Sequence, residues 1–125
     1  MREIQRIKGA CAPTALHHVS GIDEDTVLRI CALRNFVPAQ GMWTKDWLEA
    51  ADDLGIKKRK VSMEPCRLST FIKKHPKGLF LCETYNHLFV VDNSVIVDPR
   101  EKLKGNYPGL GRIIQSAWRC TPKKI

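Results

Sequence analysis

Apolar residues recur at helical spacing through the first half of the chain. Pro13 lies in a first turn and Gly21 follows a last turn, which are common helix start and stop signals. The acidic run Asp23–Asp25 complements the dipole at the start of a second helix. The pattern predicts helices at about residues 12–19, from Asp23 to Leu33 or Arg34, and from a Thr44 cap to Leu54, with a loop at 35–41.

The second half is dominated by β-branched and short apolar runs. It predicts an exposed or edge strand at 56–63, a short helix at 67–75, a buried strand at 79–83, a hairpin at 87–98 and a last strand at 113–120. Helices followed by strands favour an α+β class, with the N-terminal helices packed on an antiparallel β-sheet. No linker or repeat interrupts the pattern, so residues 1–125 are expected to form a single domain.

The hairpin carries the first candidate chemistry. Two apolar runs flank Asp92-Asn93, which predicts a two-residue turn at that dipeptide. In this register Val90 pairs with Val95, and His87 pairs with Asp98 at the open end. Opposed residues have Cβ atoms about 4.5–5.5 Å apart. The sequence therefore predicts an imidazole oriented by a carboxylate, which is half of a nucleophilic triad.

Cys11 is the candidate nucleophile. It stands at the start of the first predicted helix, where unpaired N–H groups and the helix dipole favour a thiolate. The same N–H groups could hold an oxyanion, and the side-chain amide of Gln5, six residues earlier, could add a donor. His87 is the candidate general base and Asp98 the residue that orients it.

Each of these residues also has a simpler interpretation. Cys11 could be a small core residue, His87 an ordinary strand histidine, and Asp98 the start of a turn before Pro99. The ordered set of three favours chemistry more than any single residue does. His18 lies about two helical turns past Cys11, too far along the axis to act as its base, and Cys82 is expected in the core.

In its ordered motifs the sequence resembles the papain-like cysteine peptidases, and among them the bacteriocin-processing, double-glycine-leader peptidases. The matching features are Gln5 six residues before Cys11, Leu48-Glu49-Ala50-Ala51-Asp52-Asp53-Leu54-Gly55, His87-Leu88-Phe89-Val90-Val91 and Asp98-Pro99. The resemblance covers roughly residues 5–100. It implies a papain-like cysteine peptidase fold with a catalytic set of Cys11, His87, Asp98 and Gln5.

The expected function is therefore that of a small cysteine peptidase or a related amide-cleaving or acyl-transfer enzyme, with a protein or peptide substrate. Deamidases, isopeptidases and transglutaminase-like enzymes use the same parts, and the sequence does not separate them. The alternative is a non-catalytic binding module on a peptidase-like fold, which engages a protein or nucleic acid through a basic surface.

Composition limits the remaining possibilities. Five cysteines without C-x-x-C spacing disfavour a disulfide framework and a zinc site, and no metal or cofactor is expected. No signal peptide or apolar run of membrane-spanning length is present in the sequence, so a cytoplasmic location is expected. The net charge of +8 favours, at most, weak and non-specific contact with nucleic acid or other acidic surfaces.

Overall fold

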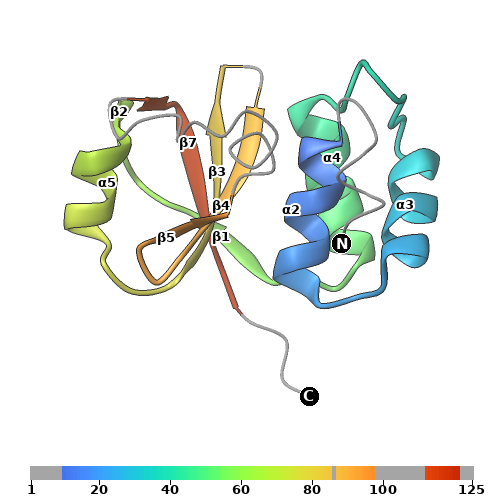
Figure 1. The fold of residues 1–125 in the computed structure, drawn as a ribbon, viewed down its shortest axis with the longest axis horizontal. Coiled ribbons are helices and arrows are strands. Elements are labelled where there is room, and N and C mark those ends of the chain that lie inside the picture. The colour runs from blue at the N-terminus through green and yellow to red at the C-terminus, as the bar shows by residue number, and fades with distance from the viewer. Residues whose placement is uncertain (1–9, 86, 98–111, 122–125) are drawn as a thin grey trace. The chain divides into compact units, whose positions relative to one another are not determined.

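The chain has an α+β fold in a computed structural model, which describes residues 10–85, 87–97 and 112–121 (Figure 1). These residues form four helices and antiparallel β-structure, as the order of the sequence elements predicts. The chain divides into two compact units, Met1–Lys57 with Pro122–Ile125, and Lys58–Thr121. The expectation of one domain over 1–125, with the helices packed on the sheet, stays a prediction. Within the described ranges no helix is long and apolar enough to cross a bilayer.

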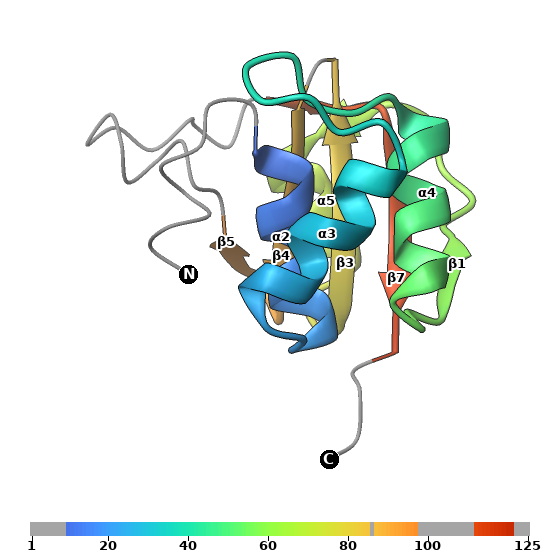
Figure 2. The same ribbon diagram turned by 90° about the vertical axis from the view of Figure 1, so that its right-hand side faces the viewer.

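The first unit is built from α2 (Cys11–Ser20), α3 (Glu24–Leu33) and α4 (Thr44–Asp53). The three helices lie side by side, and each contacts the other two (Figure 2). Their buried residues include Leu16, Val27 and Trp47, each with at most 1% of its surface exposed. The predicted helices are confirmed, although α4 begins at Thr44 with Trp43 as its cap residue.

Local chemistry explains where these helices begin and end. Asp23 caps α3, because its carboxylate accepts a hydrogen bond from the Thr26 N–H at 3.0 Å. At the other end Arg34 forms a two-pronged ion pair with Asp53, at 2.6 and 2.9 Å, which joins the end of α3 to α4. Cys31 fills the core of this unit, whereas 82% of the surface of Leu33 is exposed.

The second unit contains a five-stranded antiparallel sheet in the order β1-β7-β3-β4-β5. Its strands are β1 (Lys58–Lys60), β3 (Leu79–Thr84), β4 (His87–Asp92), β5 (Val95–Val97) and β7 (Ser116–Cys120). The lysine-rich β1 lies at an edge, as predicted. A second, two-stranded sheet pairs β2 (Cys66–Arg67) with β6 (Ile113–Ile114).

One face of the five-stranded sheet is covered by α5 (Leu68–Lys74), as Figure 1 shows. Phe71 of this helix packs edge-on against Phe80 of β3, with ring centroids 5.1 Å apart. Leu68, Cys82 and Phe89 complete the centre of this core and are fully buried. The register shows that Phe80, Cys82, Phe89 and His87 belong to the same face, because Cys82 pairs with Phe89 and Thr84 with His87.

The last predicted strand, 113–120, is divided in two. Gln115 lies between β6 and β7, and its N–H donates to the Glu83 carbonyl at 2.8 Å. Ile113 and Ile114 therefore pair with β2, whereas residues from Ser116 onward join the large sheet.

The predicted hairpin register is wrong by two residues. Val90 pairs with Val97 rather than with Val95, and the turn is formed by Asn93 and Ser94 rather than by Asp92 and Asn93. Both turn residues have positive φ, 48° and 70°, which is typical of the type I′ turn that joins two antiparallel strands.

Hydrogen bonds to a distant segment account for the shifted turn. The Asn93 N–H donates to the Gly78 carbonyl at 2.9 Å, and the Gly78 N–H donates back to Asn93 Oδ1 at 2.8 Å. The Ser94 hydroxyl donates to the Pro76 carbonyl at 2.7 Å. These partners lie at least 15 residues away in the sequence, so a pattern read only from residues 87–98 does not include them.

Candidate active site

Cys11 is the first residue of α2, as the sequence predicts, and its side chain is partly buried. The first helical hydrogen bond runs from the Thr14 N–H to the Ala10 carbonyl at 3.0 Å. The helix ends at Gly21, whose φ of 69° suits a glycine and whose N–H donates to the His17 carbonyl. The thiol therefore lies at the positive end of a complete ten-residue helix dipole.

Thr14 adds a feature that the sequence interpretation missed. Only 1% of its surface is exposed, and its hydroxyl has no hydrogen-bond partner among the residues that the structure describes. Residues three apart share a helix face, and side chains lean toward the N-terminus, so Thr14 lies on the side of α2 that carries Cys11. The spacing of three residues between Cys11 and Thr14 is the feature of the sequence that could have placed Thr14 on the same helix face as Cys11.

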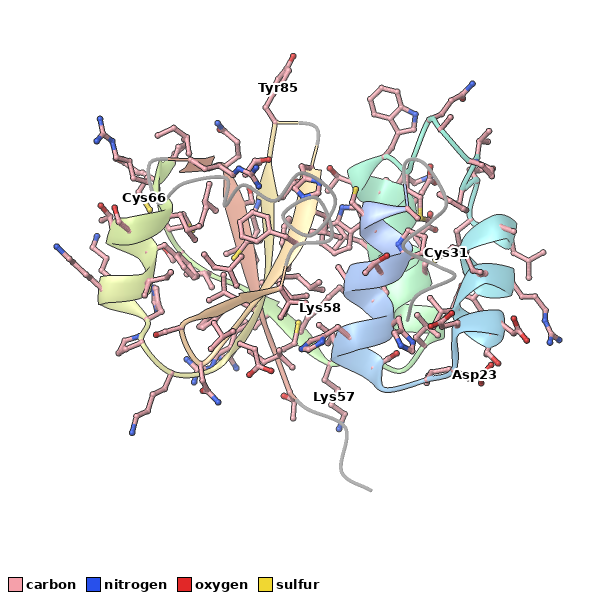
Figure 3. All side chains as sticks on the ribbon, in the orientation of Figure 1. Asp23, Cys31, Lys57, Lys58, Cys66 and Tyr85 are labelled. Atoms are coloured by element: carbon pink, nitrogen blue, oxygen red, sulfur yellow. The ribbon has the colours of Figure 1, made fainter. Side chains whose placement is uncertain are left out.

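The other cysteines differ from Cys11 in their surroundings. Cys31, Cys82 and Cys120 are buried, and burial raises the pKa of each thiol, to about 12 for Cys31 and about 11 for Cys120. Figure 3 shows Cys31 on the side of α3 that faces the other two helices of its unit. Cys66 on β2 is partly buried, which leaves it as the natural comparison for Cys11. All five cysteines are thiols without disulfide bonds.

Burial of Cys31 predicts a pH-dependent stability. The native pKa of about 12 exceeds the ordinary value of 9.0, so the neutral thiol stabilises the fold fully below pH 9 and less as the pH rises toward 12. At a pH about 1.5 units above the ordinary value, the expected loss is about 2 kcal/mol of unfolding free energy. Urea unfolding of the native chain and of Cys31→Ala across this range measures it, because other titrations cancel in the difference. A difference that stays constant with pH would contradict the expectation.

His87 is the first residue of β4 and is buried, with 5% of its surface exposed. Its ring is stacked near that of Phe89, with centroids 5.9 Å apart and an interplanar angle of 20°. Its cross-strand neighbour is Thr84, whose hydroxyl is 3.4 Å from the His87 carbonyl oxygen. His87 therefore lies at the end of a strand that pairs with β3 along its whole length, and its ring packs near that of Phe89, which suits a base that must hold one orientation.

The two other predicted site residues, Gln5 and Asp98, lie outside the described residues. The hairpin register of the described residues differs by two positions from the one that sets His87 opposite Asp98. The predicted pairing of Val90 with Val95 is therefore wrong, whereas the His87–Asp98 pair includes a residue outside the described ranges and stays a prediction. The error is an even number of residues, so it leaves the alternation of faces along β4 and β5 as expected.

Cys11 belongs to the first compact unit and His87 to the second. Their approach to each other stays a prediction. Among the described residues, no three His, Cys, Asp or Glu side chains are grouped so that they could hold a metal ion.

Comparison with known proteins gave no match for this chain among protein-family models, curated proteins or solved structures.

Proposed function

We propose that the protein is a cysteine-dependent amide-cleaving or acyl-transfer enzyme with a papain-like fold, in which Cys11 is the nucleophile. The observation that carries this proposal is the position of Cys11 as the first, partly buried residue of α2. A thiolate is stabilised at the N-terminus of a helix, and a partly exposed thiol is open to a substrate. Three of the other four cysteines are buried with raised pKa values, which makes them poor nucleophiles.

In the proposed reaction the Cys11 thiolate attacks the carbonyl carbon of an amide, and an S–C bond forms. The backbone N–H of Cys11 and the side-chain amide of Gln5 hold the negative oxygen. The His87 imidazolium gives its proton to the leaving amine as the C–N bond breaks. Water or an amine then attacks the thioester carbonyl and gives its proton to His87. The S–C bond breaks, the acyl product leaves, and the Cys11 thiolate and the His87 imidazolium are restored.

Asp98 keeps the role that the sequence predicts for it, which is to orient the His87 imidazole and to support its positive charge. Among the described residues of the hairpin, Ile96 pairs with Val91, and Val91 shares a face with His87.

The binding module remains the second candidate, and two observations favour it. The hairpin register of the described residues differs from the one on which the His87–Asp98 pair was predicted, and the second unit carries an excess of Lys and Arg. A binding module needs no catalytic thiol, so this candidate does not require Cys11 to react faster than the other cysteines.

Thiol alkylation separates the two candidates. At about neutral pH iodoacetamide is expected to modify Cys11 before the other four cysteines, because the reaction requires a thiolate. Peptide mapping identifies the modified residue. Cys11→Ala should remove the fast phase, whereas the control Cys66→Ala, also a partly buried thiol, should keep it. If the fast phase survives in Cys11→Ala, Cys11 is not the nucleophile and the binding module is the better account.

A further inference from the structure

The second unit is strongly basic in its own right. Its described residues carry nine Lys and Arg against three Asp and Glu, whereas those of the first unit carry four against seven. The positive charge of the chain is therefore concentrated on the unit that contains the sheet. Clustered positive charge of this kind attracts polyanions.

Two arginines of this unit oppose each other directly across the sheet. The register pairs Arg59 of the edge strand β1 with Arg119 of β7, and Arg119 in turn with Phe80 of β3. Both arginines are exposed and share one face, because paired residues point to the same side. Like charges directly opposite each other destabilise a sheet. Because the pairing of two arginines is unfavourable for folding, it indicates that these side chains have a role other than stabilising the sheet.

Packing holds the Arg119 side chain in place. Its guanidinium carbon is 5.4 Å from the centroid of the buried Phe80 ring. Gly78 has no side chain where Arg119 passes, since a Cβ there would lie 3.0 Å from Nη2. His75 contacts the same Phe80 ring, with centroids 5.5 Å apart. A guanidinium anchored on a ring loses less entropy when it binds an oxyanion.

Neither arginine has an acidic partner within the described ranges: no carboxylate there lies within 4.0 Å of Arg59 or Arg119. Arg34 of the first unit shows the contrast, because it binds Asp53 at 2.6 Å and Glu49 at 3.5 Å. No carboxylate of the described residues therefore competes with a bound anion for the N–H donors of Arg59 and Arg119.

We propose that Arg59 and Arg119 form a binding site for the phosphate groups of a nucleic-acid backbone. Guanidinium groups match phosphate oxygens through paired hydrogen bonds. An acidic protein fits less well, because protein interfaces use exposed apolar anchors at their centre. The exposed large apolar residues described in this unit are Tyr85, Val95 and Ile113, and none belongs to β1 or β7. Backbone contacts alone carry no base sequence, so binding should be non-specific.

The test is fluorescence anisotropy with a labelled DNA duplex of about 20 base pairs, in two unrelated sequences, titrated between about 50 and 200 mM salt. Both sequences should bind the native chain equally. The double variant Arg59→Gln, Arg119→Gln should bind about tenfold more weakly at the lower salt concentration. The slope of log affinity against log salt should fall by about one for each lost phosphate contact, and so by about two.

A second double variant controls for net charge. Arg29→Gln, Lys45→Gln removes two exposed cations from the first unit and should change the affinity less than about twofold. The single variant Arg59→Gln tests whether weaker binding results from misfolding. It relieves the repulsion from Arg119, so the melting temperature should stay constant or rise while the affinity falls about threefold.

Three results would overturn the proposal: no binding to either duplex, equal weakening in both double variants, or binding to polyglutamate with no binding to DNA, which would indicate an acidic protein partner. The proposal does not depend on catalysis by Cys11. Cys11→Ala should bind the duplex as the native chain does, so failure of the enzymatic proposal would leave this one standing.

Discussion

Replacement of Cys11 by alanine is expected to lower any amide-cleaving activity by a factor on the order of a thousand or more. The physical reason is that no other described residue offers a partly exposed thiol at the start of a ten-residue helix. His87→Ala should cause a loss of similar size, because the leaving amine then has no proton donor. Hydrolysis of fluorogenic peptide amides by each purified variant measures the effect.

The double variant Cys11→Ala, His87→Ala should be no worse than either single one, since members of one catalytic set act as a unit. His18→Ala is the matched control. It removes a partly buried imidazole from α2, the helix that begins at Cys11, and should leave the activity within about twofold. Losses that multiply in the double variant would mean that Cys11 and His87 act independently.

Phe80→Ala is expected to reduce the free energy of unfolding by about 3–5 kcal/mol. The ring is 1% exposed and contacts Phe71 edge-on at 5.1 Å, while His75 and Arg119 cover it from other sides. Its removal therefore opens a cavity between α5 and the sheet, and frees the Arg119 side chain. Urea unfolding followed by tryptophan fluorescence measures the change.

Tyr85→Ala is the control for loss of an aromatic ring. The Tyr85 side chain extends from the turn after β3, as Figure 3 shows. Its exposed fraction is 84%. The expected change is within about 0.5 kcal/mol, as for most exposed positions. Similar losses for Phe80→Ala and Tyr85→Ala would contradict the assignment of Phe80 to the core.

The helices were predictable because their signals are local. Pro13 and Gly21 delimit α2, and the Asp23 carboxylate binds an N–H only three residues away. The α+β class was also predictable, from the order of the helices and strands along the chain. Such features depend on neighbours within about one helical turn, which a sequence displays directly.

The hairpin register was not predictable, because both candidate turns satisfy the local pattern. A shift of two residues keeps every apolar side chain on its face, so the alternation of residues 87–97 fits either register. The choice depends on hydrogen bonds from Asn93 to Gly78 and from Ser94 to Pro76. The division of the last strand at Gln115 likewise depends on Glu83, a partner distant in sequence.

Part of the candidate site followed from the sequence and part did not. The position of Cys11 at a helix start and of His87 at a strand start is confirmed. The buried hydroxyl of Thr14 and the Arg59–Arg119 pairing were missed, because burial and register depend on residues that are distant in the sequence.

The most direct test of the proposed catalytic pair is the pH dependence of Cys11 alkylation, measured in the native chain and in His87→Ala. A thiolate–imidazolium pair keeps the thiolate populated in weak acid, so the native rate should change less than about tenfold between about pH 6 and pH 9. In His87→Ala the rate should instead rise about tenfold for each pH unit until the pH reaches the pKa of the thiol. Identical profiles in the two proteins would show that His87 does not support the thiolate, and would contradict the proposed catalytic pair.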